Sequence, residues 1–354
     1  LDFLPMIQIM EVTGTYGVTL WITLLNVILY ILIQNFEPNK KLGYFLGILL
    51  LGLWFSGNSR MKGFNDSLTN MGVAVLQPNI DPNAKWDYKK REKTIAYMDS
   101  LHSLAINLNP DLILFPETAL PAYLRLDRHV RDQIQSKVDS SGIPVLTGTV
   151  DRTKSPDGKK QYFNSSMFLT PNHKYILYNK LHLVPFAEYI PLSDQFPSLN
   201  MLNFGQGNFT HGSEYTVFEW KDIKFSNLIC YESSIPGVVR EFIQQGADML
   251  TIQTNDGWLG KSAGPYQHYN VARIRAIENR VSVVRSANTG ISGLILANGV
   301  SIKEQGLGEM AVFKVTVPLG ASGSFYSRNG DVFAMICFVI FLLLGPIPCI
   351  RRRS

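Results

Sequence analysis

Three residues suited to acyl transfer occur in the middle of the chain: Cys230, Glu117 and Lys180. A thiol with an ordinary pKa of about 8.5 must lose its proton before it attacks a carbonyl carbon, and a nearby carboxylate can take that proton. The oxyanion that forms next needs fixed donors, such as an ammonium group and the backbone N–H that follows the nucleophile. We therefore expect Cys230 to be the nucleophile, Glu117 its general base, and Lys180 with the Tyr231 amide the oxyanion donors.

Each of the three residues follows a short run of apolar and β-branched residues of the kind that forms a strand. Glu117 follows the run 111–115, Lys180 the run 174–178, and Cys230 closes the run 224–230. Ligands of open α/β sheets bind beyond the carboxyl ends of the strands, so these positions favour one shared site. Taken singly, each has an ordinary alternative: a turn glutamate, a solvated lysine and a small buried thiol.

The segment 71–325 predicts one layered α/β domain that positions these residues, because strand-like runs alternate in it with helical or polar stretches. The expected strands are 72–76, 111–115, 143–148, 166–169, 224–230, 249–254, 282–285 and 293–296. The expected helices are 89–107, 128–140, 237–245 and 266–280.

The segment 188–208 is long, shows no periodicity and is rich in apolar residues. The apolar residues that we expect it to expose are Ile190, Leu192, Phe196, Leu199, Met201, Leu202 and Phe204. Long segments without regular structure in compact domains are usually functional, so we expect a lid that moves or touches a membrane. The alternative is an ordinary loop packed on the core.

The charged fraction of the 354-residue chain is only 17%, against 46% hydrophobic residues, and three stretches have no Asp, Glu, Lys or Arg. They are residues 12–33, 42–57 and 332–350. A bilayer core of about 30 Å needs ~20 helical residues, so the first and third are long enough and the second is marginal. We expect a membrane region over 1–60, a C-terminal span over 332–350 and a basic tail over 351–354; buried core helices are the alternative.

The charges beside the expected spans predict an orientation, because Lys and Arg near a span stay on the cytoplasmic side. The tail with Arg351, Arg352 and Arg353 is then inside, as are Lys40 and Lys41, and the domain between the second and third spans is outside. The same topology places the first residue outside, without an initiator methionine or a secretory signal. We therefore expect at least one earlier span to be missing from this sequence.

Cysteine content, charge and motif searches exclude several other classes of protein. Cys337 and Cys349 lie in or beside the last expected span, which leaves Cys230 alone in the domain, so no disulfide framework is possible there. The net charge of +5 is diffuse and its only dense basic run is the tail, which argues against a nucleic-acid partner. The sequence has no GxSxG elbow, no HExxH and no Cys/His metal spacing, so we expect no metal and no other cofactor. His182 and His268 fit hydrogen-bonded structural roles better than proton transfer.

The sequences around the three reactive residues are LILFPETALP, YNKLHLVPFAEYIP and LICYESSIP. They resemble the motifs of the nitrilase or carbon-nitrogen hydrolase superfamily, and in detail those of its apolipoprotein N-acyltransferase family. Three further stretches agree, in order along the chain: QPNIDPNAKWD, TNDGWLGKSAGPYQHYNVARIRAIENR and FYSRNGD. The resemblance covers the domain and its flanking spans, although members of that family normally have more spans before the domain.

The resemblance implies a nitrilase-like α-β-β-α sandwich flanked by transmembrane helices, with Glu117 as base, Lys180 as oxyanion-supporting cation and Cys230 as the acylated nucleophile. It also implies supporting or substrate-binding residues at matching positions. These are the acidic Glu188 and Glu232, the aromatic Trp86 and Tyr231, and the polar Asn164.

The activity implied by the resemblance is a two-step acyl relay at a bacterial inner membrane, with the domain on the outer side. Cys230 takes a fatty acyl chain from the sn-1 position of a membrane phospholipid and holds it as a thioester. The α-amine of the N-terminal diacylglyceryl-cysteine of an apolipoprotein then accepts the chain. Two alternatives remain: a membrane-tethered nitrilase or amidase that hydrolyses a carbon-nitrogen bond, and an inactive domain that only binds lipoproteins.

Overall fold

Strand β1 (Asn70–Gln77) shows how the sequence produces a layered structure. Its side chains alternate between two faces, as in any strand. Val73 and Val75 pack in the core between two sheets, whereas Ala74 and Leu76 pack in a second core under helices. Both faces are therefore covered. The structure is a computed structural model and describes residues 3–34, 40–62, 69–81, 87–193, 195–202, 208–260, 262–320 and 323–344.

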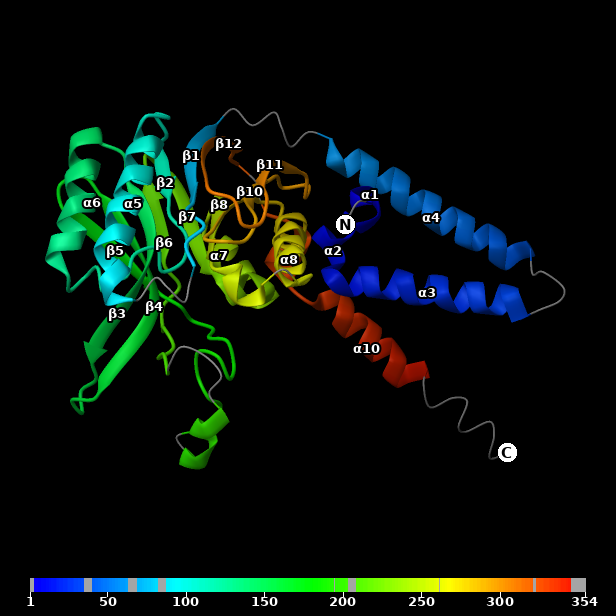
Figure 1. Ribbon diagram of the computed structural model, residues 1–354. Helices are drawn as coiled ribbons and strands as arrows, with labels where there is room; N and C mark the ends of the chain where they lie inside the picture. The colour runs from blue at the N-terminus through cyan, green and yellow to red at the C-terminus, as the bar shows by residue number, and fades with distance from the viewer. Residues whose placement is uncertain are drawn as a thin grey trace.

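Two six-stranded sheets face each other at the centre of the molecule (Figure 1). The first has the order β12 (Ala311–Pro318), β1, β2 (Leu112–Leu114), β3 (Val145–Lys154), β4 (Lys160–Thr170), β5 (Lys174–Asn179). The second has the order β11 (Ser301–Gln305), β10 (Ser292–Ile295), β9 (Ser282–Ala287), β8 (Met249–Thr254), β7 (Ile223–Ile229), β6 (Val217–Trp220). In each sheet three strands are parallel, β1-β2-β3 and β7-β8-β9, and the flanking strands are antiparallel.

Helices cover the outer face of each sheet and complete an α-β-β-α sandwich (Figure 1). α5 (Tyr88–Ile106) and α6 (Arg128–Ser141) cover the first sheet; α7 (Pro236–Gln244) and α8 (Gly264–Asn279) cover the second. Side-chain caps begin two of them, since Asp87 and Asp127 accept hydrogen bonds from backbone N–H groups of the first turns of α5 and α6. The predicted fold class is confirmed.

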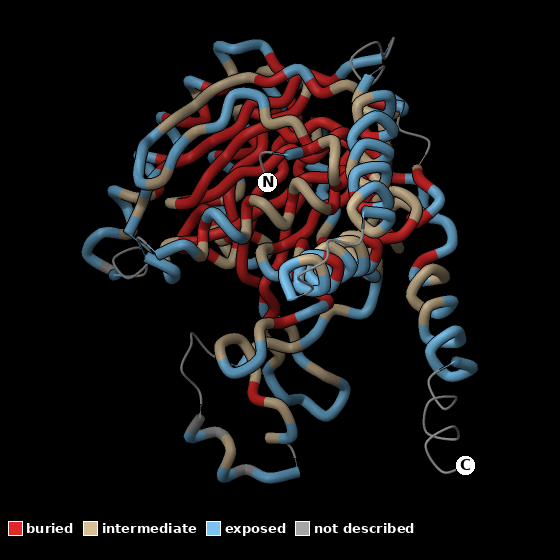
Figure 2. The backbone as a smooth tube through the Cα atoms, turned by 90° about the vertical axis from the view of Figure 1, so that its right-hand side faces the viewer, coloured by how far each residue is buried: buried red, intermediate tan, exposed pale blue. Residues whose placement is uncertain are grey.

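Two helices before the sandwich, α3 (Thr15–Gln34) and α4 (Lys40–Met61), are long and apolar enough to cross a membrane. Most of their surface is exposed, as the pale blue helices of Figure 2 show. The first helix begins at residue 15 rather than at the predicted 12, because Gly14 takes a φ of +61° and ends the short helix α2 (Met10–Thr13). α4 is longer than the predicted span 42–57 because the polar residues at both ends continue the helix.

The third predicted span, 332–350, lies partly outside the described residues. Its described part is α10 (Val332–Leu344), a fully apolar helix of 13 residues without a buried side chain. The remaining residues of this span and the basic tail 351–354 are not described.

Polar and apolar contacts, which together form a seam, join the N-terminal helices to the side of the sandwich that contains the second sheet. Leu4, Ile7 and Met10 pack on Ile277 of α8. The side chain of Gln8, from the segment between α1 (Leu4–Ile7) and α2, donates to the carbonyl of Asn298 at 3.0 Å. Other hydrogen bonds join Arg280 to Gln8 and Glu11, the Thr15 amide to Glu278, and Asn298 to the carbonyl of Met61.

The segment 188–208 contains a 3₁₀ helix, η1 (Pro197–Leu202), which lies below the sandwich in Figure 1. The prediction that Ile190 is exposed is wrong: its side chain is 3% exposed because it turns back onto the domain. Leu192, Phe196 and Met201 are exposed as predicted. Leu199 is half-buried, and the side chains of Leu202 and Phe204 lie outside the described residues.

Candidate active site

Strand ends from both sheets bring the predicted reactive residues toward one place. Glu117 follows β2, Lys180 follows β5 of the same sheet, and Cys230 follows β7 of the other sheet. Both Glu117 and Lys180 act electrostatically on the Cys230 thiol: Glu117 raises its pKa and Lys180 lowers it. The predicted arrangement at the carboxyl ends of strands therefore agrees with the fold.

A buried polar bridge between the sheets sets how these strand ends face each other. The amide of Gln253, in β8, donates to the carbonyl of Phe115 at 2.8 Å and to that of Leu146 at 3.2 Å. Its carbonyl accepts from Ser166 at 2.5 Å and from Asn227 at 3.0 Å. Because buried polar groups cost free energy when unpaired, this bridge permits only one alignment of the two sheets.

The turn that carries Glu117 rests directly on Gly148 of β3. The amide of Gly148 donates to the carbonyl of Pro116, and the amide of Ala119 donates to the carbonyl of Gly148. A Cβ at Gly148 would lie 2.4 Å from the Thr118 nitrogen and 2.6 Å from the Glu117 Cα. Only glycine therefore allows the turn to approach the strand this closely.

Glu117, Asn164, Glu188 and Lys180 form a chain of hydrogen bonds. The Asn164 amide donates to Glu117 Oε1 at 2.8 Å and to Glu188 Oε1 at 2.9 Å. Lys180 Nζ donates to both oxygens of Glu188, at 2.9 and 2.8 Å. Burial alone would lower the pKa of Lys180, but Glu188 and then Glu117 raise it, and the net shift is upward. Lys180, which is 1% exposed, therefore stays a cation beside the thiol.

Cys230 sits at a sharp turn between β7 and the 3₁₀ helix η2 (Cys230–Ser234), with a φ of +51°. This left-handed conformation costs a residue with a Cβ about 1–2 kcal/mol, so surrounding contacts must hold it. Burial, and then the charge of Glu117, raise the pKa of the Cys230 thiol to about 12, although Lys180 opposes the shift. The resting group is therefore a thiol that reacts only if a base takes its proton.

Glu232 ties the nucleophile turn to the backbone after Lys180. Its Oε2 accepts from the Ile229 amide at 2.8 Å. Its Oε1 accepts from the Leu181 amide and the Tyr178 hydroxyl, both at 2.7 Å, and from the His182 amide at 3.2 Å. The side chain is fully buried, and burial raises its pKa while these donors and Lys180 oppose the rise. Glu232 is thus a positioning group between two parts of the site.

Two aromatic residues, Tyr231 and Trp86, are predicted beside the site. Tyr231 directly follows the nucleophile and is 38% exposed, so its ring is open to a substrate while its backbone stays in η2. Trp86 lies outside the described residues.

One group of residues in the described part of the chain has spacing that suits a metal: Cys230, Asp256 and His268 place ligand atoms within 4.8 Å of one another. However, Asp256 already binds two other groups, His268 Nδ1 at 2.8 Å and Arg285 Nη2 at 2.6 Å. The Arg285 guanidinium supplies the positive charge that a metal ion would otherwise bring. This donor set therefore does not suit a metal.

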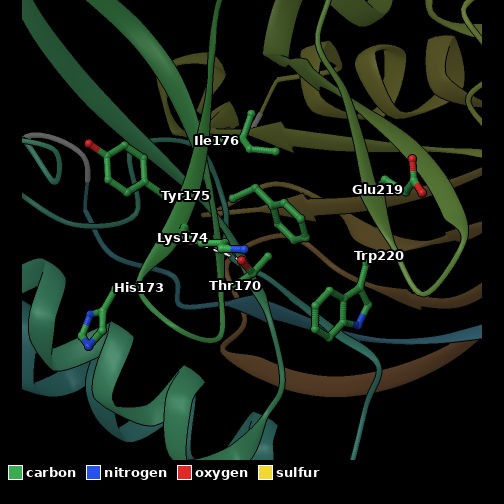
Figure 3. Close-up of a pocket in the computed structure, with 8 residues that line it drawn as sticks. Thr170, His173, Lys174, Tyr175, Ile176, Glu219 and Trp220 are labelled. Carbon is green, nitrogen blue, oxygen red and sulfur yellow. Dashed lines mark hydrogen bonds between the residues drawn. The ribbon is translucent and has the colours of Figure 1, made fainter.

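An open hollow of about 580 Å³ lies elsewhere, at the edge strands β5 and β6 (Figure 3). Phe168 and Thr170 of β4, His173 of the following turn, Lys174, Tyr175 and Ile176 of β5, and Glu219 and Trp220 of β6 line it. None of the predicted site residues that the structure describes lines it.

Comparison with known proteins places the chain in one family. The carbon-nitrogen hydrolase family model matches residues 72–325. The apolipoprotein N-acyltransferase of Geobacter metallireducens is 35% identical over 360 residues, which are 99% of this chain and 68% of that protein. This chain belongs to the apolipoprotein N-acyltransferase family. That of Chlorobaculum tepidum is 34% identical over 99% of this chain and 72% of its own length.

The family match extends beyond the sandwich, since 99% coverage includes α3 and α4. Solved structures show the same sandwich: an amidase of the nitrilase superfamily from Nesterenkonia AN1 has a TM-score of 0.55 and 18% identity, and covers 76% of this chain. This chain is thus a nitrilase-like sandwich joined to apolar helices.

Reasoning from the sequence missed three contributors to the site: Gln253, Asp256 and Arg285. Gln253 is visible as a polar residue inside the apolar run 249–254, a signal that points to a buried partner. Asp256 and Arg285 come together with His268 only in three dimensions, although the expected hydrogen-bonded role of His268 is confirmed. Asp256 lies in the motif that begins at Thr254, and that position was its only signal.

Proposed function

We propose that this protein is an apolipoprotein N-acyltransferase in which Cys230 carries the acyl chain. The observation that carries the proposal is the 35% identity to such an enzyme over 99% of the chain, apolar helices included. The hydrogen-bond chain of Glu117, Asn164, Glu188 and Lys180 supports it, because acyl transfer from a protonated thiol needs a carboxylate base and a cation, and this chain holds one of each in fixed relation.

In the first step Glu117 takes the thiol proton while the Cys230 sulfur attacks the sn-1 ester carbonyl of a phospholipid. Lys180 and the Tyr231 amide stabilise the tetrahedral oxyanion. The ester C–O bond then breaks, the proton passes from Glu117 to the leaving oxygen, and a lysophospholipid departs. A carbon–sulfur bond has formed, and the acyl chain remains as a thioester.

In the second step the α-amine of a diacylglyceryl-cysteine attacks the thioester. Glu117 takes a proton from the amine, and the carbon–sulfur bond breaks. The leaving thiolate regains a proton from Glu117, so the catalyst returns to its starting state. Asn164 and Glu188 keep Glu117 and Lys180 in place through both steps, and Tyr231 and Trp86 contact the substrate.

The membrane assignment belongs to the same proposal. Helices α3, α4 and α10 project from one side of the sandwich (Figure 1), and we propose that all three insert in a bacterial inner membrane. The catalytic domain 71–325 then lies on the outer side and the tail 351–354 on the inner side. Both substrates keep their chains in lipid and present their head regions to the site.

The test supplies the purified full chain, in phospholipid bicelles, with a phospholipid labelled in its sn-1 chain and a synthetic diacylglyceryl-cysteine peptide. We expect label on the peptide amine in wild type, and less than about one hundredth of that rate in Glu117→Gln. Cys230→Ser is the matched control for loss of the thiol.

Release of labelled free fatty acid with an unlabelled peptide would overturn the proposal in favour of hydrolysis, the chemistry of a membrane-tethered amidase. Unchanged peptide labelling in Cys230→Ser would equally overturn it, because the thioester would then not be an intermediate.

A further inference from the structure

A second charged cluster contacts the turn that carries Cys230. It consists of Asp256 after β8, His268 in α8 and Arg285 in β9. Their side chains are 1%, 11% and 0% exposed. Arg285 Nη2 donates to Asp256 Oδ2 at 2.6 Å, and Arg285 Nε donates to the carbonyl of Ile291 at 3.0 Å. None of these residues has a role in the acyl relay described above.

The structure makes room for this cluster at one glycine. A Cβ at Gly290 would lie 2.2 Å from Asp256 Oδ2 and 2.9 Å from its Cγ. Thr254, the last residue of β8, adds a hydrogen bond from its hydroxyl to Asp256 Oδ1 at 3.0 Å. Asp256 is therefore fixed from three sides, by a strand end, an arginine and a close backbone approach.

Asp256 in turn fixes the orientation of the His268 ring. His268 Nδ1 lies 2.8 Å from Asp256 Oδ1 and 3.1 Å from Arg285 Nη2. Burial and the Arg285 charge lower the pKa of His268, whereas its hydrogen bonds to Asp256 and the Cys230 carbonyl oppose the shift. The other ring nitrogen, Nε2, lies 3.0 Å from the Ser233 hydroxyl oxygen.

The Ser233 hydroxyl connects this cluster to the nucleophile turn. Its oxygen lies 2.8 Å from the Cys230 carbonyl oxygen, and His268 Nε2 lies 3.1 Å from the same oxygen. Ser233 thus donates its hydrogen to the carbonyl of the strained residue Cys230. Cys230 is the residue of this turn that has a left-handed backbone, so the hydrogen bond restrains the strained residue itself.

Fixing this carbonyl also fixes the amide group on the other side of the same peptide bond. A trans peptide is planar, so the Cys230 C=O and the Tyr231 N–H point in opposite directions along one rigid unit. A rotation that freed the carbonyl would swing the N–H by the same angle. Oxyanion donors act only when they point at the place where the charge develops.

We infer that Asp256, His268 and Ser233 are positioning residues that aim the Tyr231 N–H at the oxyanion of the acyl-transfer reaction. The inference rests on the proposed role of Cys230 as the acylated nucleophile, and it adds a role for residues that touch neither the base nor the cation. It requires no specific acyl donor.

The test uses the full chain in detergent with p-nitrophenyl butyrate, an activated ester that reports acylation of the thiol as a burst of nitrophenol. Ser233→Ala removes one buried oxygen, and His268→Gln replaces the ring. We expect both to lower the burst rate constant about 10- to 100-fold with an unchanged KM. Alkylation of Cys230 by iodoacetamide, which forms no oxyanion, should stay within about 3-fold of wild type.

His102→Gln is the matched control, because His102 is a buried histidine that packs on Phe115 from the opposite layer. It should lower the melting temperature without changing burst or alkylation. Equal losses of burst and alkylation in Ser233→Ala would overturn the inference, since the thiol itself would then be disturbed. An unchanged burst in Ser233→Ala, or no burst in wild type, would also overturn it.

The proposed function can fail separately from this inference. If wild type takes no label from a phospholipid but Ser233→Ala still loses the ester burst selectively, the lipid substrate is wrong and the positioning role stands.

Discussion

The two halves of the sandwich contribute to the site in different ways. The half built on the first sheet contributes charges, namely Glu117, Glu188 and Lys180, linked to one another through hydrogen bonds and Asn164. The half built on the second sheet contributes Cys230 on a strained backbone. The first half therefore supplies the proposed base and cation, and the second supplies the nucleophile and the contacts that hold its backbone.

The halves also differ in what lies behind them. The first sheet is backed by α5 and α6, whereas the second is backed by α8, which contacts the N-terminal helices through Ile277 and Glu278. α8 also carries His268 toward the nucleophile. The half that carries Cys230 is therefore also the half that contacts the apolar N-terminal helices. The fold positions the nucleophile and these helices together.

The largest effect should follow from removing the base on the charged half. Glu117→Gln should lower single-turnover acyl transfer by about 10²- to 10⁴-fold. Because the Glu117 charge raises the pKa of Cys230, the same change should move the pH midpoint of thiol alkylation downward from about 12. The rate of Cys230 alkylation measured as a function of pH tests this shift. An unchanged midpoint in Glu117→Gln would show that the Glu117 charge does not act on the thiol.

The next effect concerns Glu232, which joins the halves through its donors at Ile229 and Leu181. Glu232→Gln would place an amide N–H against those donors, so the free energy of unfolding should fall by about 2–4 kcal/mol. Denaturant unfolding measures it, with the exposed Glu219→Gln as control. A loss within 0.5 kcal/mol, the usual range of surface changes, would show that the halves are not joined there.

The seam behind the nucleophile half predicts a dependence on pH. Burial raises the pKa of Glu278 to about 7, against Arg275 and the Thr15 amide, from an ordinary 4.5. Because the pKa of Glu278 is higher in the folded state, the protonated side chain stabilises the fold fully below pH 4.5. This contribution to the free energy of unfolding, roughly 3 kcal/mol at most, is lost as the pH rises through 7. Glu278→Gln should make the free energy of unfolding less dependent on pH between 4.5 and 7. The exposed Glu304→Gln should leave that dependence unchanged.

The smallest effect should follow from crowding the turn of Glu117. Gly148→Ala places a Cβ 2.4 Å from the Thr118 nitrogen, which should cost about 1–3 kcal/mol of stability and lower kcat by up to about 100-fold. Gly237→Ala is the matched control because its Cβ meets nothing within 4 Å. A wild-type kcat in Gly148→Ala would mean that the turn tolerates movement.

The sequence predicts the buried strands well and the edges poorly. The run 249–254 coincides with β8, whose residues are buried on both faces of the sheet. Strands β6, β11 and β12 were missed; the first two are short and partly exposed, and β12 pairs with β1, which lies far away in the sequence. The periodicity of a short segment carries no information about a pairing with a strand so far away in the sequence.

For the site, the motifs predict which residues matter but not how they are held. Glu117, Lys180 and Cys230 were proposed from their types, strand-end positions and neighbouring motifs. The bridge made by Gln253 and the contact of Gly148 with the Glu117 turn depend on distances between elements. Such contacts leave no pattern along the chain, so only the structure reveals them.

The central claim, that Cys230 carries an acyl chain, is tested most directly by intact-mass analysis of the purified full chain after incubation with a single defined phospholipid. The account predicts a mass increase equal to one sn-1 acyl chain, localised to the peptide with Cys230 and removed by hydroxylamine. A protein that gains no mass, or that gains it equally in Cys230→Ser, would contradict the account.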